Sequence, residues 1–520
     1  MRTRWSVRAV VVVIVGVATS GRAAEPIAPI SYTIRMPQPD THVAEVEATI
    51  PTGGRATVDL MMPVWSPGFY RVENYAGRVQ SLSARTPDGR ALSVDQPKKN
   101  RWQVQTGGAS AVVVSYTLLC TGRSVTTNWV GEDFAVFNGS ATFVTLAEQA
   151  RRPHDVRLEL PAKWKRSMTG LDAAGDGRPH HYRAADFDTL VDSPIVAGNP
   201  TVREFDVDGS KHFLVDLGDA PQWNGERAAA DIDKIVREHR RFWGFLPFKK
   251  YVFLNVFRQG AGGLEHLNST LLTSSPRATT PSYSWLAFVC HEYFHAFNVK
   301  RLRPVELDPF DYEQPPNTTG LWVSEGLTTY YGELLAGRAG LGTARDVLGR
   351  LSGHIERLQQ SPGRLKQTLE QSSLDVWNSG TSGVGRTTAT TLSYYVKGPV
   401  VGFLLDARIR RATDGAKSLD DVMRLAYKRY SGDRGFTAEQ FRTTAEEAAG
   451  IDLKEWLRKA VASTEELDYV EALDWFGLRF AAPGGEPPRP SWKLEIRQDA
   501  TDSQKARLRD WLGKAAITAP

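Results

Sequence analysis

Two histidines and a glutamate, His291, Glu292 and His295, form the pattern H-E-x-x-H inside an apolar stretch that runs from Trp285 to Asn298. This stretch has the pattern of one amphipathic helix, and side chains four residues apart on a helix leave the same face one turn apart. Two imidazoles in that position can supply half of a tetrahedral zinc site. The carboxylate of Glu292 then lies beside the open coordination position, where it can act as general base toward a water.

A hydrolytic zinc site needs a third protein ligand, and a carboxylate for this role lies 30 residues after the second histidine. Glu325 belongs to the segment Trp322-Val-Ser-Glu-Gly-Leu-Thr-Thr-Tyr-Tyr331, near the start of a second predicted helix. Considered alone, it is equally compatible with a solvated glutamate that the helix dipole stabilises. The H-E-x-x-H pattern upstream and the aromatic residues around Glu325 favour the metal ligand.

A glycine-rich segment upstream carries polar residues that suit peptide recognition. Gly262, Gly263, Glu265 and His266 follow an apolar strand. Glycines let the backbone approach a peptide closely, so this strand edge can pair with an extended substrate. In that arrangement Glu265 meets the positive charge of a free α-amine, whereas the alternative is an ordinary loop with an exposed acid.

Two adjacent tyrosines occur in the segment Ser393-Tyr-Tyr-Val-Lys-Gly398. A phenol of Tyr394 or Tyr395 can donate a hydrogen bond to the oxyanion of a tetrahedral intermediate. Two tyrosines at the start of a helix are, however, more often part of a hydrophobic core.

The elements that must position these residues fall into three stretches. Residues 29 to about 200 alternate apolar and polar side chains, with turns every ten or so residues, as in an antiparallel sandwich. Residues 226–243 have a helical pattern and residues 251–257 form an apolar strand. Helical patterns follow at 285–298 and 321–338 and dominate from 341 to 465, before a Pro/Gly-rich linker at 483–490 and a last helix at 502–512.

The N-terminus has the order of a secretory signal peptide. Arg2, Arg4 and Arg8 precede a ten-residue apolar run, and small residues follow up to Ala24. The run is well short of the ~20 residues that cross a bilayer, so we expect residues 1–24 to be cleaved and the mature protein to be periplasmic or secreted, with no stable membrane insertion.

Charge and cysteine content exclude some other functions. The formal charge of +5 includes four arginines up to residue 22, and without them 60 basic residues face 59 acidic ones. No block of Lys and Arg is present, so nucleic-acid binding is not indicated. The two cysteines, Cys120 and Cys290, fall in different predicted regions, and we expect two separate buried thiols.

Taken together, these segments resemble one family of peptidases. The similarity lies in Gly262-Gly-Leu-Glu-His266, His291-Glu-Tyr-Phe-His-Ala-Phe-Asn-Val-Lys-Arg-Leu-Arg-Pro304, Trp322-Val-Ser-Glu-Gly-Leu-Thr-Thr-Tyr-Tyr331, Tyr394-Tyr-Val-Lys-Gly-Pro399 and Val64-Trp-Ser-Pro-Gly-Phe-Tyr-Arg71. This combination is similar to the glycyl aminopeptidase family, a branch of the gluzincin metallopeptidases, over roughly residues 30 to 475.

The resemblance implies a multidomain α+β protein. It implies an N-terminal antiparallel β-sandwich at 25–200, a thermolysin-like zinc-peptidase catalytic domain at 201–340, a helical C-terminal domain at 341–475, and a linker and tail at 476–520. Many members carry a PDZ domain after the helical domain. The roughly 40 residues after Leu478 are too few for the ~90 of that fold, so we expect the PDZ domain to be absent.

The resemblance also implies roles for the site residues. It implies one Zn²⁺ per chain, bound by His291, His295 and Glu325, with Glu292 as base. The glycine-rich segment is similar to the Gly-x-Met-Glu-Asn loop of the related aminopeptidase N group, which implies that Glu265 holds the substrate N-terminus. The oxyanion-stabilising tyrosine of that group lies in Tyr-x-Lys-Gly, which matches Tyr395 rather than Tyr394.

We therefore expect an exported zinc aminopeptidase that removes small N-terminal residues, Gly or Ala, from peptides with a free N-terminus. One alternative is a zinc endopeptidase of the same fold without the restriction to the N-terminus. The other is a catalytically silent peptide-binding protein, which the intact set of base, ligands and tyrosine disfavours.

Overall fold

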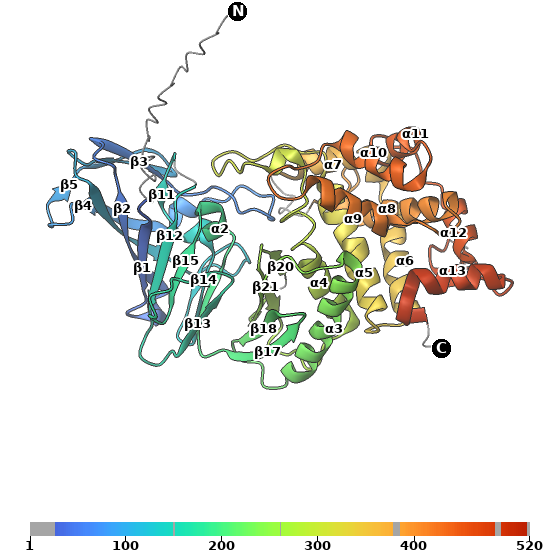
Figure 1. Cartoon of the computed structure of the whole chain (residues 1–520), viewed down its shortest axis with the longest axis horizontal. Helices are drawn as coiled ribbons and strands as arrows, with labels where there is room; N and C mark the ends of the chain where they lie inside the picture. Colours follow the sequence, from blue (N-terminus) through green and yellow to red (C-terminus); the bar gives the residue numbers. More distant parts are fainter. Residues whose placement is uncertain (1–26, 149–150, 261, 378–384, 484–489, 517–520) are drawn as a thin grey trace, which may run out of the picture.

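The computed structural model describes residues 27–148, 151–260, 262–377, 385–483 and 490–516. The predicted signal peptide, residues 1–24, lies outside them. The described chain runs from a β-rich N-terminal region, through a smaller sheet, to a set of helices on the opposite side of the molecule (Figure 1). None of the described helices is long and apolar enough to cross a membrane.

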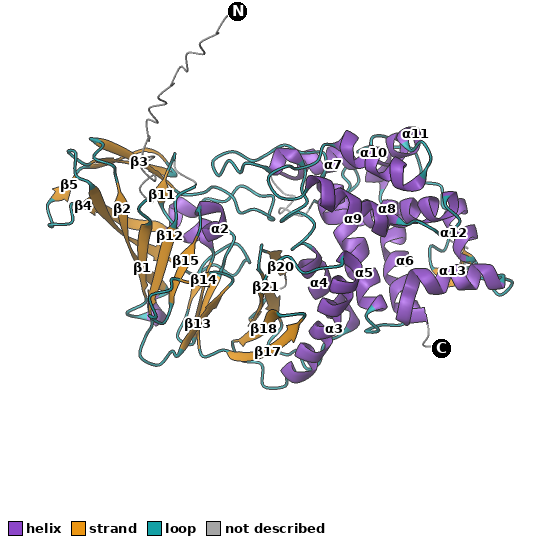
Figure 2. Ribbon diagram, viewed as in Figure 1, coloured by secondary structure: helices purple, strands orange, loops and turns teal. Residues whose placement is uncertain are grey.

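The N-terminal region is built, over its described residues, from three sheets (Figure 2). The large sheet has the order β14-β15-β12-β1-β2-β8-β4-β5 and consists of β1 (Ile30–Arg35), β2 (Val43–Pro51), β4 (Val79–Arg85), β5 (Ala91–Leu92), β8 (Ala111–Leu119), β12 (His154–Glu159), β14 (Asp172–Ala173) and β15 (His181–Ala184). A second sheet, β11-β3-β7-β6, consists of β3 (Thr57–Met61), β6 (Val94–Lys98), β7 (Arg101–Gln105) and β11 (Thr145–Leu146). A third, β13-β16-β10-β9, consists of β9 (Trp129–Val130), β10 (Phe134–Phe137), β13 (Arg166–Thr169) and β16 (Ile195–Gly198). Two short helices, α1 (Gly139–Thr142) and α2 (Phe187–Val191), lie between these strands.

The three sheets share one hydrophobic core, to which Ile34, Leu60 and Phe137 each contribute from a different sheet. The alternation of apolar and polar residues therefore reflects strands with one face in this core, as the sequence predicts. One pairing departs from the antiparallel expectation, because β1 and β12 pair in parallel. Parallel neighbours need a long connection, and residues 36–153 supply it.

The middle sheet lies between the N-terminal sheets and the helices (Figure 2). Over the described residues its order is β17-β18-β19-β21-β20, with β17 (Thr201–Val207), β18 (Ser210–Leu217), β19 (Lys250–Phe257), β20 (Gly262–Glu265) and β21 (Ser269–Ser274). Helix α3 (Gly225–Trp243) follows β18. The architecture thus changes between β16 and β17, near residue 200, although the division into domains stays a prediction.

Both faces of the middle sheet are buried, which explains why β19 is buried without interruption from Tyr251 to Phe257 and is apolar there except for Asn255. Phe253 packs into the core of the helices. Its neighbour Leu254 points the other way, because successive strand residues alternate between faces. Together with Val215, it packs against Val136 and Val196 of the third N-terminal sheet. We call this contact the apolar seam.

The helices follow the middle sheet in the chain. They are α4 (Tyr283–Phe294), the π-helical turn η4 (Trp322–Gly326), α5 (Leu327–Arg338), α6 (Ala344–Gln360), α7 (Leu369–Leu374), α8 (Tyr394–Ala412), α9 (Leu419–Tyr430), α10 (Ala438–Ala449), α11 (Lys454–Val461), α12 (Val470–Phe476) and α13 (Asp502–Leu512). A two-stranded sheet, β22 (Leu478–Phe480) with β23 (Leu494–Ile496), precedes α13. The predicted helix at 502–512 is confirmed, and its buried Trp511 donates to the Tyr330 hydroxyl over 2.8 Å, so this part of the tail packs on the helices.

Helix α4 differs from its prediction in two ways. It ends at Phe294, so His295 caps the helix and the chain turns away before Asn298. Its buried residues also surround the helix rather than forming one apolar stripe, because α4 lies in the core between the middle sheet and α5. The second predicted helix begins as η4 and continues as α5, so Glu325 lies in a π-helical turn, a feature common at functional sites.

The two cysteines are free and buried, as expected. Burial raises the pKa of the Cys120 thiol to about 12 and that of Cys290 well above its usual value, so both are inert small hydrophobes rather than nucleophiles.

Candidate active site

Three side chains from two helices converge on one point. Nε2 of His295 lies 3.0 Å from Nε2 of His291. Glu325 brings its Oε2 to 3.2 Å from His295 Nε2 and to 3.8 Å from His291 Nε2. The ligand atoms of all three residues lie within 4.8 Å of one another. The structure therefore brings together the three residues that the sequence predicts as metal ligands.

Asn298 holds the second histidine and the π-helical turn at once. The Nδ1–H of His295 donates to the Asn298 carbonyl over 3.1 Å, which leaves Nε2 free for a metal. The Asn298 amide donates to the Val323 carbonyl at 2.9 Å and to the Ser324 carbonyl at 3.2 Å. These carbonyls belong to η4, so one buried amide fixes the distance between the α4 end and the Glu325 turn.

Two tyrosines from distant parts of the chain donate to the Glu325 carboxylate. The Tyr395 hydroxyl, at the start of α8, lies 2.7 Å from Oε2. The Tyr70 hydroxyl, from the N-terminal region, lies 3.2 Å from Oε1. Each carboxylate oxygen therefore has a protein donor, which fixes the plane of the carboxylate.

A glycine contact brings α8 close enough for Tyr395 to reach. A Cβ built on Gly326 would lie 2.7 Å from the Cα of Gly398, and one on Gly398 would lie 2.6 Å from the Cα of Gly326. Any side chain at either position would push η4 and α8 apart. Gly326 follows the ligand Glu325, and Gly398 lies about one turn after Tyr395, so the pair sets the distance between these two groups.

The electrostatics of the three residues favour a cation. Burial and the neighbouring His295 lower the pKa of His291 to about 3, so this imidazole is neutral and offers a lone pair. Burial alone would lower the pKa of His295, but the carboxylates of Glu325 and Glu265 raise it to about 9. Two imidazoles and a carboxylate, buried together in a field that stabilises positive charge, are a donor set that zinc accepts.

Glu292 lies beside this cluster. It is 4% exposed, and its Oε2 has no hydrogen-bond partner among the described residues. Burial and the charge of Glu265 raise its pKa well above the usual value. A Cβ built on Gly263 would lie 2.3 Å from Glu292 Oε1, so this glycine gives β20 the room to pass the carboxylate.

Glu265, at the end of β20, faces the same space. Its side chain is 4% exposed, and its Oε1 has no hydrogen-bond partner in the described part of the chain. Lys300 Nζ lies 3.9 Å from that oxygen and donates to Asp192 over 2.8 Å. Burial raises the pKa of Glu265, and the Lys300 charge opposes that rise.

His266 does not join Glu265 at this space. It shares a buried contact with Asp192, with 3.0 Å between Nδ1 and Oδ1, and it is not among the residues that line the cavity of the site. Adjacent residues at a strand end point to opposite sides, so the side chain that follows Glu265 is directed into the protein. The substrate-contacting role that the sequence suggests for His266 has no support in this geometry.

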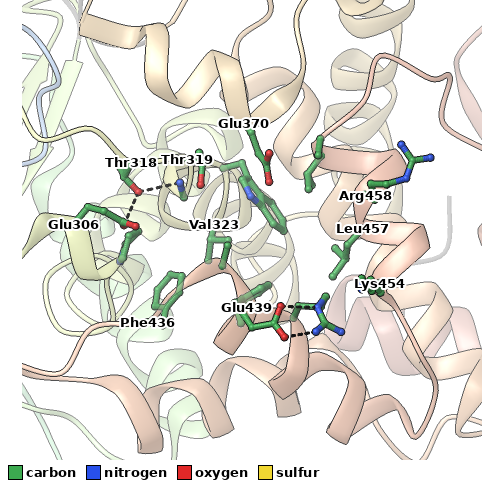
Figure 3. Close-up of a pocket in the computed structure, with 18 residues that line it drawn as sticks. Glu306, Thr318, Thr319, Val323, Glu370, Phe436, Glu439, Lys454, Leu457 and Arg458 are labelled. Carbon is green, nitrogen blue, oxygen red and sulfur yellow. Dashed lines mark hydrogen bonds and ion pairs between the residues drawn. The ribbon is translucent and has the colours of Figure 1, made fainter.

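A cavity of about 600 Å³ opens onto the cluster. Gly262, Gly263, Glu265 and Glu292 line it together with the three ligand residues, and Phe69, Arg123 and Val125 line it from the N-terminal region. A second cavity, of about 270 Å³, lies behind η4. Figure 3 shows Val323, Phe436 and Leu457 around it, with Glu370 at its edge; it holds no residue of the metal cluster.

An H-E-x-x-H helix and a carboxylate from the next helix, set behind N-terminal β-sheets, define a zinc metallopeptidase. Residues 31–199 match the model of the Peptidase M61 N-terminal domain, and residues 284–401 match the model of M61 glycyl aminopeptidase. The chain belongs to the M61 glycyl aminopeptidase family.

Several solved structures have a similar fold. An aminopeptidase N family protein from Idiomarina loihiensis has 28% sequence identity and a TM-score of 0.81, over 87% of this chain and 79% of that one. An M1 zinc metallopeptidase from Deinococcus radiodurans, solved as a mutant bound to a Tyr-Ser-Ala substrate, has 14% identity and a TM-score of 0.52, over 85% and 95%. Yeast LTA4 hydrolase has 13% identity and a TM-score of 0.50, over 83% and 67%. No curated protein sequence matches the chain.

The structure adds three residues to those that the sequence singles out. Asn298 and Lys300 follow the H-E-x-x-H motif directly, and that proximity is a signal for their positioning roles. Tyr70 belongs to the segment Val64–Arg71, which the family resemblance includes, but no local pattern indicates its contact with Glu325.

Proposed function

We propose that this protein is an exported aminopeptidase that binds one zinc ion per chain and removes a small N-terminal residue from peptides. The observation that carries the proposal is the buried Glu265 carboxylate in the cavity of the metal cluster. Its Oε1 has no hydrogen-bond partner among the described residues, and Lys300 Nζ lies 3.9 Å away. Leaving a buried carboxylate oxygen without a hydrogen bond is costly, and a substrate ammonium group would supply that bond.

The backbone at Gly68 supports a restriction to the chain end. A Cβ built on Gly68 would lie 2.3 Å from Glu265 Oε1, so the N-terminal region closes directly over the carboxylate. A substrate amine that reaches Glu265 therefore has little room for further residues on its N-terminal side. An endopeptidase needs that room.

The chemistry that zinc supplies when bound to His291, His295 and Glu325 is that of a Lewis acid toward a carbonyl and a water. Glu292 takes a proton from the attacking water and returns it to the leaving amine. Its raised pKa suits a group that must hold a proton between these two steps.

During the reaction Tyr395 turns its one hydroxyl hydrogen from Glu325 Oε2 to the substrate oxygen on which negative charge develops. Burial and the charge of Glu325 raise the pKa of its hydroxyl well above the usual value, so the phenol stays protonated and can act as donor. Glu265 holds the amine and so fixes which peptide bond meets Glu292.

The preference for Gly is supported by the name of the matched family, Ala is added as the next smallest residue, and export is supported by the order of residues 1–24. Both remain proposals, as does the assignment of peptides with a free N-terminus as substrates.

The test compares glycyl- and alanyl-arylamides with their N-acetylated forms. We expect cleavage of the free-amine substrates only, complete loss of activity with a zinc chelator, and recovery when zinc is added. Glu265→Gln should lower kcat/KM on free-amine substrates by about 100-fold, because a buried charge-assisted hydrogen bond is lost, while zinc content stays at one per chain. Glu370→Gln, at the edge of the second cavity, is the matched control and should leave kcat/KM unchanged.

Two outcomes contradict the proposal. Equal cleavage of acetylated and free-amine substrates would favour the endopeptidase. Stoichiometric zinc binding without cleavage of any small-residue substrate would favour the silent peptide-binding protein.

A further inference from the structure

Arg258 is an arginine in an unusual setting. It directly follows β19 and is 8% exposed, yet its Nε and Nη1 have no hydrogen-bond partner among the described residues. Its Nη2 donates to the Ser124 carbonyl over 3.2 Å. No carboxylate in the described part of the chain forms an ion pair with it. Burial and the nearby Arg123 lower its pKa to about 10, so it remains charged at neutral pH.

Arg123 lies close to this buried charge. It is exposed, lines the active-site cavity, and packs over the Trp129 ring with its Cζ 5.3 Å from the ring centroid. Within the described residues it, too, has no carboxylate in ion-pair distance. A guanidinium group at one edge of a cavity, with a second one buried nearby and neither paired to an acid among the described residues, makes a place for an anion.

The position of these arginines relative to β20 identifies the anion. β20 ends the middle sheet and, in the described part of the chain, pairs only with β21, so its other edge is free. A peptide added antiparallel to that edge places its first residue opposite Glu265 and later residues opposite Gly263 and Gly262. A Cβ built on Gly262 would lie 3.7 Å from Val125 Cγ1, so the peptide runs toward the loop that carries Arg123.

The distance along the strand sets the length of that peptide. Extended residues rise ~3.4 Å each, so a peptide of three residues whose first residue lies opposite Glu265 ends opposite Gly263, and one of four residues ends opposite Gly262. The cavity then has the carboxylate of Glu265 on one side and the guanidinium group of Arg123 on the other. A short peptide with both ends free carries the complementary charges, an ammonium and a carboxylate, at about that separation.

We propose that Arg123, backed by the buried Arg258, binds the free C-terminal carboxylate of peptide substrates about two to four residues long. This inference rests on the proposed function, because it takes Glu265 as the position of the substrate amine. It assigns the enzyme to the trimming of very short peptides rather than of protein N-termini.

The experiment compares trialanine with trialanine amide, which differ only in the C-terminal charge. In the wild-type enzyme we expect kcat/KM to be about tenfold or more higher for the free acid. Arg123→Gln should remove that ratio by raising KM for the acid, with kcat and the amide kinetics changed by less than about twofold. Arg258→Met should have the same effect if it folds; Arg123→Gln tests the proposal in either case.

Two further variants serve as controls. Arg178→Gln removes one charge from an arginine that is 63% exposed on a turn of the N-terminal sheets, and it should leave the ratio unchanged. Arg357→Gln removes a charge that lines the same cavity from α6. A loss of the acid preference in Arg357→Gln but not in Arg123→Gln would overturn the assignment. A wild-type ratio near one would overturn it as well.

Failure of this inference is distinguishable from failure of the proposed function. Every substrate in the comparison has a free amine, so an acid-to-amide ratio of one alongside intact release of N-terminal alanine would reject only the carboxylate site. Cleavage of N-acetyl-trialanine at the rate of trialanine would instead reject the aminopeptidase itself.

Discussion

The two walls of the active-site cavity differ in how their polar atoms are satisfied. On the helix wall, each predicted metal ligand is held by a protein group: His291 by the Thr329 hydroxyl, His295 by the Asn298 carbonyl, and the two oxygens of Glu325 by Tyr70 and Tyr395. On the strand wall, Glu265 Oε1 has no hydrogen-bond partner in the described part of the chain, and the same holds for Nε and Nη1 of Arg258, which follows β19. The first wall is complete before a substrate arrives, whereas the second contains groups whose partners come from outside.

This difference separates two tasks. Metal ligands must be held in one geometry before binding, because a zinc site tolerates little displacement. Substrate contacts instead gain affinity from groups that remain unpaired until the ligand arrives, since pairing them then relieves a desolvation cost. Glu292 is an exception among the cavity-lining residues of the helix wall, because its Oε2 has no hydrogen-bond partner among the described residues.

The largest expected effect tests that exception. Glu292→Gln keeps the shape of the side chain but cannot accept the proton of the attacking water. We expect kcat to fall by roughly 1,000-fold, with zinc stoichiometry unchanged in elemental analysis. Loss of zinc in this variant would show instead that Glu292 helps to hold the metal.

Tyr395→Phe sharpens the description of the helix wall. The variant loses the donor to Glu325 Oε2 and the donor proposed for the oxyanion, so kcat should fall by about 100-fold. Steady-state kinetics on alanyl-arylamide measures this. Tyr394→Phe is the matched control, because that hydroxyl is buried without a hydrogen-bond partner in the described part of the chain, and its removal should leave kcat unchanged.

Tyr70→Phe should give the smallest effect. Its hydroxyl touches only the outer oxygen of the ligand carboxylate, so zinc affinity should weaken by about tenfold while kcat at saturating zinc stays close to wild type. Competition with a chromophoric chelator measures the affinity. An unchanged zinc affinity would mean that the N-terminal region contributes nothing to the ligand geometry.

Much of the helix wall was predictable because its residues obey local spacing. The four-residue interval between His291 and His295 places both imidazoles on one face of a helix. Glu325 could be predicted as the third ligand because the next helix packs back against the first. The end of α4 at Phe294 was not predictable, because the turn depends on the contacts of Asn298 with η4, which lies 24 or more residues further along.

The strand wall was predictable only in part. The glycines at 262 and 263 identify a strand that something approaches closely, and Glu265 ends that strand. The substrate contact predicted for His266 stays a prediction, and the structure places its ring against Asp192, away from the cavity. Tyr70 reaches Glu325 across 255 residues, and Arg258 meets the Ser124 carbonyl across 134, separations at which single-sequence patterns carry no information.

The apolar seam means that the N-terminal sheets and the middle sheet cannot be separated without exposing buried apolar side chains. Val136 and Val196 on one side, and Val215 and Leu254 on the other, are fully buried only because the two sheets meet. A truncated chain that starts at residue 201 would expose this apolar face to water, which favours aggregation. It would also lack Tyr70, Arg123 and the backbone at Gly68. The chain should therefore not be divided near residue 200, although the fold changes there. A graft that transfers the activity to another scaffold must include both sheets.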